Sequence, residues 1–180
     1  FIARALPQHS HRAHGRVVVA HLGNGASMAA MVNRKCVATT LGFSTIDGLL
    51  MGTRCGNLDP GVILHLMETK GLSVKDMTKL LYKESGLLGV SGISQDMRTL
   101  LASDKPEAEE AVNLFCYRIV RELGSLVAAA GGLDALVFTG GIGEHAAEVR
   151  RRVCEQSEGL GIRLDPEAET QDTEVQENAT

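Results

Sequence analysis

The chain is poor in aromatic side chains and has no excess of positive charge. Tryptophan is absent from its 180 residues, aromatic residues make up only 3% of it, and the formal net charge is -4. Proteins that bind nucleic acid present clustered basic residues, and those that bind single strands stack the bases on aromatic rings. Because this sequence has neither feature, we expect that nucleic acid is not among its partners.

The sequence also lacks a long hydrophobic run. A membrane-spanning helix needs roughly 20 consecutive apolar residues, and no stretch of the sequence approaches that length. The start, FIARALPQHSHRAHGR, lacks the charged, apolar and small-residue order of a signal peptide. We therefore predict a cytoplasmic protein that does not enter a membrane.

Cysteines are few and follow no pattern. The four of them, Cys36, Cys55, Cys116 and Cys154, form no CxxC pair and no regular framework. Such spacing indicates neither a zinc site nor a disulfide scaffold. We expect reduced, ordinary cysteines, and we assign no metal ligand in this sequence.

The remaining composition suits one globular domain. The chain is 44% hydrophobic and 22% charged, and a domain of this length buries about two thirds of the surface of its unfolded chain. FIARALP is typical of the end of a helix that began earlier, with Pro7 as its stop. We expect residues 1–15 to be the remnant of that helix and a connector, and residues 16–165 to form the domain. Residues 166–180 are acidic and polar, so we expect a loosely held tail.

The domain begins with three short apolar runs. The run 16–22 is β-branched and nearly continuous in apolar character, which predicts a central strand buried on both faces. The runs 26–32 and 35–41 follow at short spacing, and together the three predict an antiparallel meander. Asn24 and Gly25 lie between the first two runs and predict a type I′ hairpin turn, which needs positive φ at both residues.

The rest of the chain shows mainly helical patterns. The longest has Pro106 in its first turn and Gly131 past its end, as helix termini prefer. A glycine-rich segment, SGLLGVSGIS, separates the middle helices from this long one. A mixture of strands and helices in this order predicts an α/β layer structure. The patterns predict helices over 60–71, 73–85, 106–130 and 145–160, and a strand over 134–139.

Three glycine-rich turns recur: HLGNGAS at 21–27, SGISQDMR at 91–98 and TGGIGEH at 139–145. Glycines at a strand end let backbone N–H groups approach a phosphate, and a following helix N-terminus adds partial positive charge. A tight turn without a ligand uses the same residues. The sequence has no GxxxxGK[ST] motif, and GGIG lacks the spacing of the dinucleotide fingerprint. His21, alone at a strand end, is typical of a hydrogen-bonded structural residue. Simple turns and a phosphate site both remain open at this point.

Arg54 lies in GLLMGTRCGNLDPG, between two glycine-containing turns. A guanidinium group on a loop suits a phosphoryl group, because its donors match the phosphate oxygens and it stays charged. The competing interpretation is a surface ion pair with Asp47 or Asp59, and spacing alone slightly favours that pair. Asp96 and Arg98 present the same two alternatives.

In combination, these segments resemble one family. VVVAHLGNGAS, TTLGFSTIDGLLMGTRCGNLDPG, SGISQDMR and LVFTGGIGEH stand in the order and at the spacing of the acetate and propionate kinase family, over about residues 1–165. The resemblance implies an actin-like ATPase fold, with a mixed sheet of the ribonuclease-H-like type and flanking helices. It also implies that nucleotide lies in a cleft between two such domains, and that this chain is most of the second, nucleotide-binding one.

The resemblance also implies which residues serve the nucleotide. Arg54 matches the arginine that stabilises the transferring phosphoryl group, so it is the catalytic candidate. The family usually has an aromatic residue where Met97 stands and an asparagine where His145 stands. The ATP-contacting segments of the family match His21, Leu22, Gly23, Asn24 and Gly25, then Asp96, Met97 and Arg98, and finally Gly141, Ile142, Gly143, Glu144 and His145.

The implied activity is reversible transfer of the γ-phosphate of ATP to a short-chain carboxylate such as acetate, giving ADP and an acyl phosphate, with Mg²⁺. A homodimer is implied as well. The acyl pocket, the catalytic aspartate and the magnesium-linked glutamate of the family find no match in these 180 residues. We therefore expect the chain alone to be inactive. The alternative function is an actin-like nucleotide-binding module with a structural or regulatory role.

Overall fold

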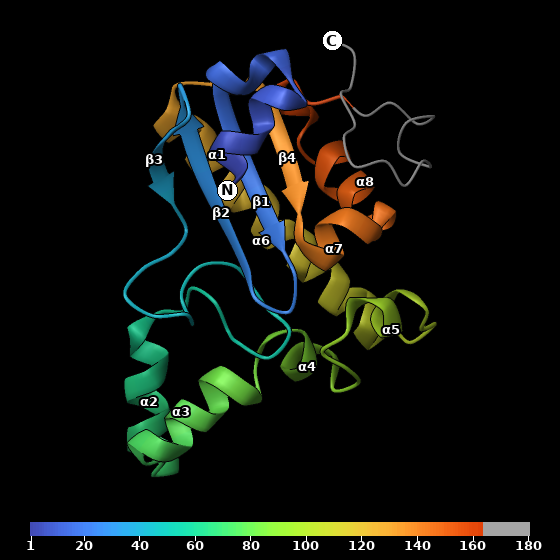
Figure 1. Ribbon diagram of the computed structural model, residues 1–180. Coiled ribbons are helices and arrows are strands. Elements are labelled where there is room, and N and C mark those ends of the chain that lie inside the picture. The colour runs from blue at the N-terminus through green and yellow to red at the C-terminus, as the bar shows by residue number, and fades with distance from the viewer. Residues whose placement is uncertain (164–180) are drawn as a thin grey trace.

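The computed structural model describes residues 1–163 and has a four-stranded sheet flanked by helices (Figure 1). The strand order is β3-β2-β1-β4, in which β1 pairs antiparallel with β2 and parallel with β4. Because β2 and β3 also pair antiparallel, the predicted three-strand meander is confirmed. The strands are β1 (Arg16–Leu22), β2 (Ala26–Val32), β3 (Lys35–Thr39) and β4 (Ala135–Thr139).

The central strand β1 is buried on both faces, as its continuous apolar run predicts. Val18, Ala20 and Leu22 belong to the main core of the domain. Val17 and Val19, which point to the other face of the strand, belong to a smaller apolar cluster. The strand is therefore fixed from two sides, and so is the position of the loop that follows it.

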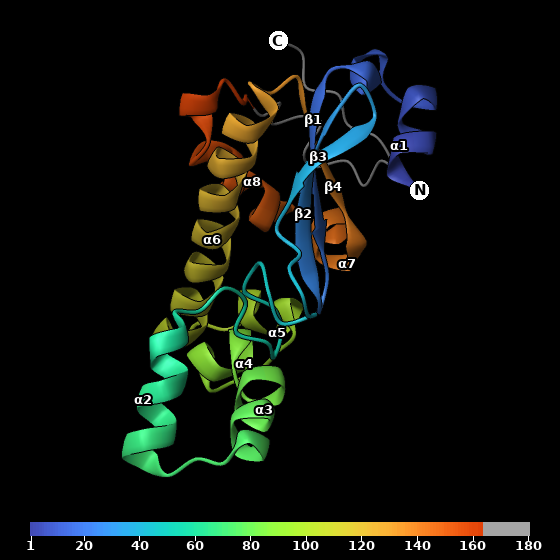
Figure 2. The same cartoon turned by 90° about the vertical axis from the view of Figure 1, so that its left-hand side faces the viewer.

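Helix α6 (Pro106–Ala130) covers the main face of the sheet. It has Pro106 in its first turn and ends at Gly131, whose φ of +75° is the left-handed conformation of a helix C-cap. Figure 2 shows α6 along one side of the sheet and α1 (Ile2–Ala5) on the other. One face of α6 is apolar and packs in the main core. Its buried residues are Ala108, Ala111, Val112, Phe115, Cys116, Ile119, Leu123 and Leu126.

The first fifteen residues pack on the opposite face of the sheet. Helix α1 ends before Pro7, and two short 3-10 turns, Leu6–Gln8 and His11–His14, follow it. Leu6 and Ala13 are buried in the smaller apolar cluster. The predicted tail, residues 166–180, lies outside the described residues.

The hairpin turn between β1 and β2 differs from the prediction. Positive φ at Asn24 and Gly25 was expected, but among the described residues the only non-glycine positive φ values are those of Asn33, at +47°, and Arg34, at +64°. Leu22 pairs with Ala26, so three residues rather than two connect these strands, and a three-residue loop does not require a type I′ turn. The I′-like conformation lies instead between β2 and β3.

Four helices connect the meander to α6. Asp59 caps the first of them, and Ser73 and Asp76 form a capping box at the start of the second. The segment SGLLGVSGIS was expected only to separate helices, and this was wrong, because most of it forms a short helix. The four are α2 (Pro60–Lys70), α3 (Val74–Lys83), α4 (Gly86–Ser91) and α5 (Met97–Leu101).

The segment after β4 also differs from an open glycine turn. Its glycines form α7 (Gly140–His145), and the predicted helix over 145–160 is the shorter α8 (Ala147–Glu155) followed by a 3-10 turn, Glu158–Leu160. Gly140 enters α7 with a φ of +79°, which glycine adopts without steric cost. Within residues 1–163, none of the helices has the length and apolar character that crossing a membrane requires.

Candidate active site

The parallel pairing of β1 and β4 brings two of the glycine-rich segments together. His21 and Thr139 are partners in the register of these strands, so the residues that follow them leave the sheet at the same end (Figure 1). A Cβ atom on Gly140 would lie 2.7 Å from the carbonyl oxygen of Leu22 and 3.2 Å from Cε1 of His21. The start of α7 therefore rests against the end of β1, and this close approach requires glycine.

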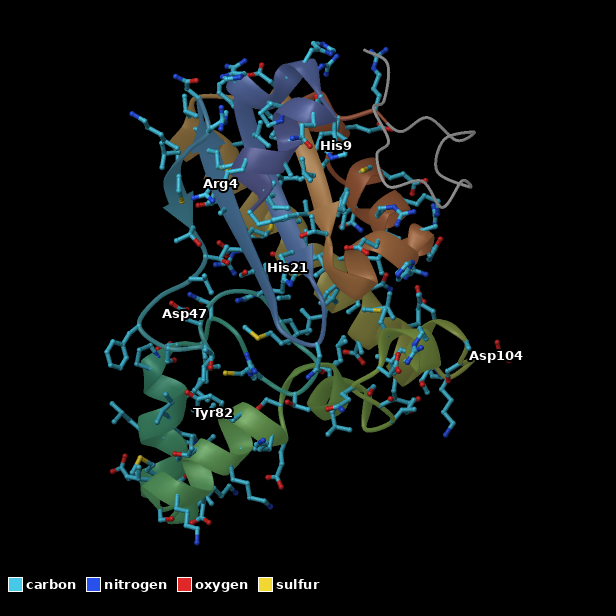
Figure 3. The ribbon with its side chains drawn as sticks, in the orientation of Figure 1. Arg4, His9, His21, Asp47, Tyr82 and Asp104 are labelled. Atoms are coloured by element: carbon cyan, nitrogen blue, oxygen red, sulfur yellow. The ribbon has the colours of Figure 1, made fainter. Side chains whose placement is uncertain are left out.

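His21 lies at this end of β1 with its side chain exposed, and Figure 3 labels it. Its Nδ1 is 3.0 Å from Oγ1 of Thr139 across the two strands. This hydrogen bond agrees with the expectation of a structural histidine. It also fixes the ring beside Gly140, at the start of α7.

A second contact joins that loop to the segment that carries Arg54. The N–H of Gly52 donates to the carbonyl oxygen of Asn24 at 2.9 Å. A Cβ on Gly25 would lie 3.5 Å from Nη1 of Arg54, so the guanidinium group lies directly beside the loop. A Cβ on Gly52 would overlap the side chain of Asn24 and lie 3.3 Å from the carbonyl oxygen of Gln95. The loop, the Arg54 segment and the segment before α5 therefore meet at Gly52.

Arg54 is half-buried, and its contacts do not match the competing ion-pair interpretation. Its Nη1 donates to the carbonyl oxygen of Thr45 at 3.1 Å. Within residues 1–163 it forms no ion pair with Asp47 or Asp59. Asp47 accepts a hydrogen bond from the N–H of Gly48, and Asp59 caps α2. Because a backbone carbonyl carries no net charge, the positive charge of the guanidinium group beside the first loop is not neutralised.

Asp96 and Arg98 pair with each other. Arg98 donates to Asp96 through Nη2 at 2.6 Å and through Nε at 3.1 Å, and Asp96 also caps α5. These hydrogen bonds lower the pKa of Asp96 from 3.8 to about 2. The side chain of Met97 is buried in the main core. Any contact of Met97 with a ligand would therefore use its backbone.

Helix α7 holds the third candidate segment. A Cβ on Gly141 would meet no atom within 4 Å, whereas Gly143 is buried against Phe138. Ile142 packs at the edge of the core, and Glu144 and His145 are exposed. Glu144 turns back to accept a hydrogen bond from the N–H of Gly140 at 3.0 Å. The open face of the helix thus lies at Gly141.

One residue that supports α7 could not be recognised from the sequence. Arg150 of α8 is a buried cation, and its Nη1 donates to the carbonyl oxygens of Gly143 at 2.9 Å and Glu144 at 2.5 Å. Carbonyls at the end of a helix have no partner within the helix, and positive charge is favourable there. In the sequence Arg150 stands in an arginine triplet on a helix, a pattern typical of a solvated face.

The described residues include no group of three or more His, Cys, Asp or Glu side chains that could hold a metal ion. Mg²⁺ in phosphoryl-transfer sites is usually held by one or two carboxylates together with substrate phosphates, and no residue of 1–163 is assigned to the Mg²⁺ that the resemblance implies.

The topology of the mixed sheet and its flanking helices is that of the actin-like ATPase fold class. Among solved structures, the acetate kinase of Porphyromonas gingivalis is 42% identical with a TM-score of 0.83, over 87% of this chain and 40% of that one. The acetate kinase of Entamoeba histolytica is 33% identical with a TM-score of 0.87, over 93% of this chain and 45% of that one.

Sequence comparison identifies the family. The chain belongs to the acetokinase family, whose model matches residues 1–179. An acetate kinase of Rhodopseudomonas palustris (strain TIE-1) is 66% identical over 170 residues, which are 93% of this chain and 43% of that protein. An acetate kinase of Methylocella silvestris is 56% identical over 161 residues, 89% of this chain and 40% of that protein. The chain thus spans about two fifths of the length of these curated relatives.

Proposed function

We propose that this chain is the nucleotide-binding part of a phosphotransferase. The enzyme moves the γ-phosphate of ATP to a short-chain carboxylate such as acetate and forms ADP and an acyl phosphate, reversibly. The observation that carries the proposal is the position of Arg54, half-buried beside Gly25 with no carboxylate partner in the described residues. An unneutralised guanidinium group next to a glycine loop suits a phosphoryl group that gains charge in the transition state.

In this proposal the glycine-rich segments bind the phosphates and the arginine acts on the transferring group. Phosphoryl transfer by in-line displacement depends on positioning and on charge stabilisation, so no covalent protein intermediate is needed. The backbone of Gly23–Gly25 and the open face of α7 at Gly141 lie at the same end of the sheet. Contacts from these two segments and from Asp96–Arg98 form the proposed ATP site, and Mg²⁺ would be supplied with the nucleotide.

The alternative is an actin-like module that binds nucleotide without transferring phosphate to a carboxylate. Such a module would need the glycine segments but not Arg54. The test uses a chimaera in which residues 1–163 of this chain replace the matching part of the R. palustris acetate kinase. Hydroxylamine converts acyl phosphates to hydroxamates, so the proposal expects hydroxamate formation from ATP and acetate. Nucleotide binding by a folded chimaera without any hydroxamate would favour the module instead.

We further propose that two copies of the chain associate through α2. This helix buries none of its residues in the described part of the chain, although its sequence is largely apolar. Leu64 is 67% exposed and Val62 is 40% exposed. A second copy of the same helix would cover both, as an isologous contact of a symmetric dimer requires. The cytoplasmic location remains a prediction.

A further inference from the structure

The segment Met51–Cys55, which carries Arg54, is held by the junction between α3 and α4. The first N–H groups of a helix have no partner within the helix, and here those of α4 donate to carbonyl oxygens of this segment. The backbone hydrogen bonds are Leu87 N–H to Met51 at 2.8 Å, Leu88 N–H to Gly52 at 3.0 Å, Ser85 N–H to Thr53 at 3.0 Å and Cys55 N–H to Leu81 at 3.2 Å.

Gly86, the first residue of α4, lets the backbone of Arg54 pack against this junction. Its φ is +65°, in the region that favours glycine. A Cβ at this position would lie 2.9 Å from the carbonyl oxygen of Arg54 and 3.0 Å from its nitrogen, and closer still to the carbonyl of Met51. The Arg54 backbone therefore rests on the start of α4 with no room between them.

A side-chain hydrogen bond completes this support. The hydroxyl group of Thr53 donates to the carbonyl oxygen of Tyr82 at 2.8 Å, and Thr53 is half-buried. Tyr82, labelled in Figure 3, lies in the last turn of α3, where carbonyl groups lack partners within the helix. Thr53 is thus tied to α3 by its side chain and to Ser85 by its backbone, next to Arg54 in the chain.

We propose that Thr53 is a positioning residue for Arg54. It does not touch the nucleotide; its hydroxyl group holds the Arg54 segment against the end of α3, so that the guanidinium group stays beside Gly25. This inference rests on the proposed function of Arg54. Misplacement of a catalytic group by about 1 Å can cost 10²-fold in rate. Loss of one hydrogen bond leaves the four backbone bonds in place, so we expect a partial effect of about 10-fold on kcat.

The experiment uses the chimaera described above and four substitutions. Thr53→Val removes the hydroxyl group and keeps the shape, and Thr53→Ser keeps the hydroxyl group. Thr78→Val is the control, because Thr78 makes the same kind of bond, 2.7 Å to the carbonyl of Val74, on the exposed side of α3. Arg54→Ala supplies the background in which a residue acting only through Arg54 has no further effect.

The expected result is that Thr53→Val lowers kcat about 10-fold with the KM for ATP nearly unchanged, while Thr53→Ser and Thr78→Val stay within about 2-fold. In the Arg54→Ala background, Thr53→Val should change kcat less than about 2-fold. Two results would overturn the proposed role of Thr53 but leave that of Arg54 intact. One is an unchanged kcat for Thr53→Val, and the other is a loss of kcat in the Arg54→Ala background as large as the loss in the unsubstituted chimaera. A normal kcat for Arg54→Ala overturns the proposed function of Arg54, and the role of Thr53 with it.

A second measurement uses the 180-residue chain itself. The amide hydrogens of Ser85 and Cys55 bond across the junction, so Thr53→Val should speed their exchange with solvent by about 5- to 10-fold, and Thr78→Val should not. Unchanged exchange at both amides would contradict the support that Thr53 provides. If the valine variant does not fold, Thr53→Ala and Thr53→Ser differ by the hydroxyl group alone and make the same comparisons.

Discussion

At the scale of single residues, the effect of replacing Arg54 distinguishes the proposed transferase from a module that only binds nucleotide. Replacing it with alanine in the chimaera should lower kcat by about 10³-fold, because an arginine that stabilises the phosphoryl transition state contributes 10³ to 10⁵ in related systems. The KM for ATP should change little, because the glycine segments remain. Arg54→Lys should recover only part of the rate, because an ammonium group cannot form the two parallel hydrogen bonds that a guanidinium group makes to a phosphoryl group. Steady-state kinetics in both substrates would measure these effects, and a normal kcat for Arg54→Ala would refute the assignment.

Gly141 tests the proposed phosphate contact of α7. A Cβ there meets no atom within 4 Å, so Gly141→Val should leave the fold intact and place its methyl groups on the open face. We expect ATP to bind at least about 10-fold more weakly, a loss of about 1.4 kcal/mol. Gly124→Val is the matched control, because Gly124 lies in α6 with equally open surroundings. Titration calorimetry and melting curves would check the result, and unchanged ATP affinity in a folded Gly141→Val protein would exclude α7 from the site.

For His21, Asp96 and Arg98 the sequence left open a structural role or a phosphate contact, and the structure shows hydrogen bonds that fit the structural role. His21 bonds to Thr139 as a structural histidine does, and Asp96 pairs with Arg98, two residues away. The neighbours of Arg54 could not be predicted from the sequence. Its contact with Gly25 depends on long-range packing of separate loops. Spacing favoured an ion pair of Arg54 with Asp47 or Asp59, and this pair is not formed within residues 1–163.

At the scale of elements, an ion pair joins the starts of β1 and β4. It is formed by Arg16, the first residue of β1, and Asp134, which directly precedes β4. Asp134 accepts from Nε of Arg16 at 2.8 Å, from Nη2 at 2.6 Å and from the Arg16 backbone N–H at 2.6 Å. These bonds lower the pKa of Asp134 from 3.8 to about 2. Because the folded-state pKa lies below the ordinary value, the pair stabilises the fold above about pH 4 and loses this effect as the pH falls towards 2.

Asp134→Asn should therefore lower the melting temperature at pH 7 by roughly 2–4 °C, since both partners are partly exposed. The variant should also lose less stability than the original chain between pH 4 and pH 2. Asp104→Asn, on an exposed aspartate, is the control and should behave like the original chain. Thermal unfolding followed by circular dichroism at each pH would measure both effects. Equal pH dependence in all three proteins would mean that the pair contributes nothing.

Long, strongly periodic elements were predictable and short glycine-rich ones were not. The ends of α6 agree with the prediction because Pro106 and Gly131 each have one favoured place at a helix end. Helices α4 and α7 have six residues each and are rich in glycine, which disfavours helix. Tertiary contacts stabilise them instead, as the bonds from Arg150 to the end of α7 illustrate.

At the scale of the whole molecule, the exposed apolar surface of α2 predicts self-association. A stable dimer buries about 1,200 to 2,000 Å² in total, and in this proposal Val62 and Leu64 of α2 lie inside that interface. Light scattering at tens of micromolar should give the mass of a dimer, and Leu64→Gln should shift it towards the monomer. Val74→Gln is the control, because Val74 on α3 is 71% exposed, close to the 67% of Leu64. A monomer for the unsubstituted chain would end the proposal.

The last prediction concerns what the 180-residue chain does by itself. Phosphoryl transfer requires donor, acceptor, metal and charge-stabilising groups in one water-excluded site, because electrostatic interactions weaken strongly in water. The described residues supply the glycine segments and Arg54, but their side chains include no cluster that could hold a metal ion. The chain also spans only about two fifths of its acetate kinase relatives.

We therefore expect the purified chain to form no acyl phosphate from ATP, Mg²⁺ and excess acetate or propionate. The chimaera, assayed in parallel by hydroxamate formation, provides the positive control and the reference rate. Weak ATP binding is still expected, because the contacts among the first loop, Gly52 and α7 all lie within residues 1–163 and need no other part to form. Acyl phosphate formation by the chain at even about a thousandth of the chimaera's rate, far above what an incomplete site allows, would show that the essential groups lie within these residues.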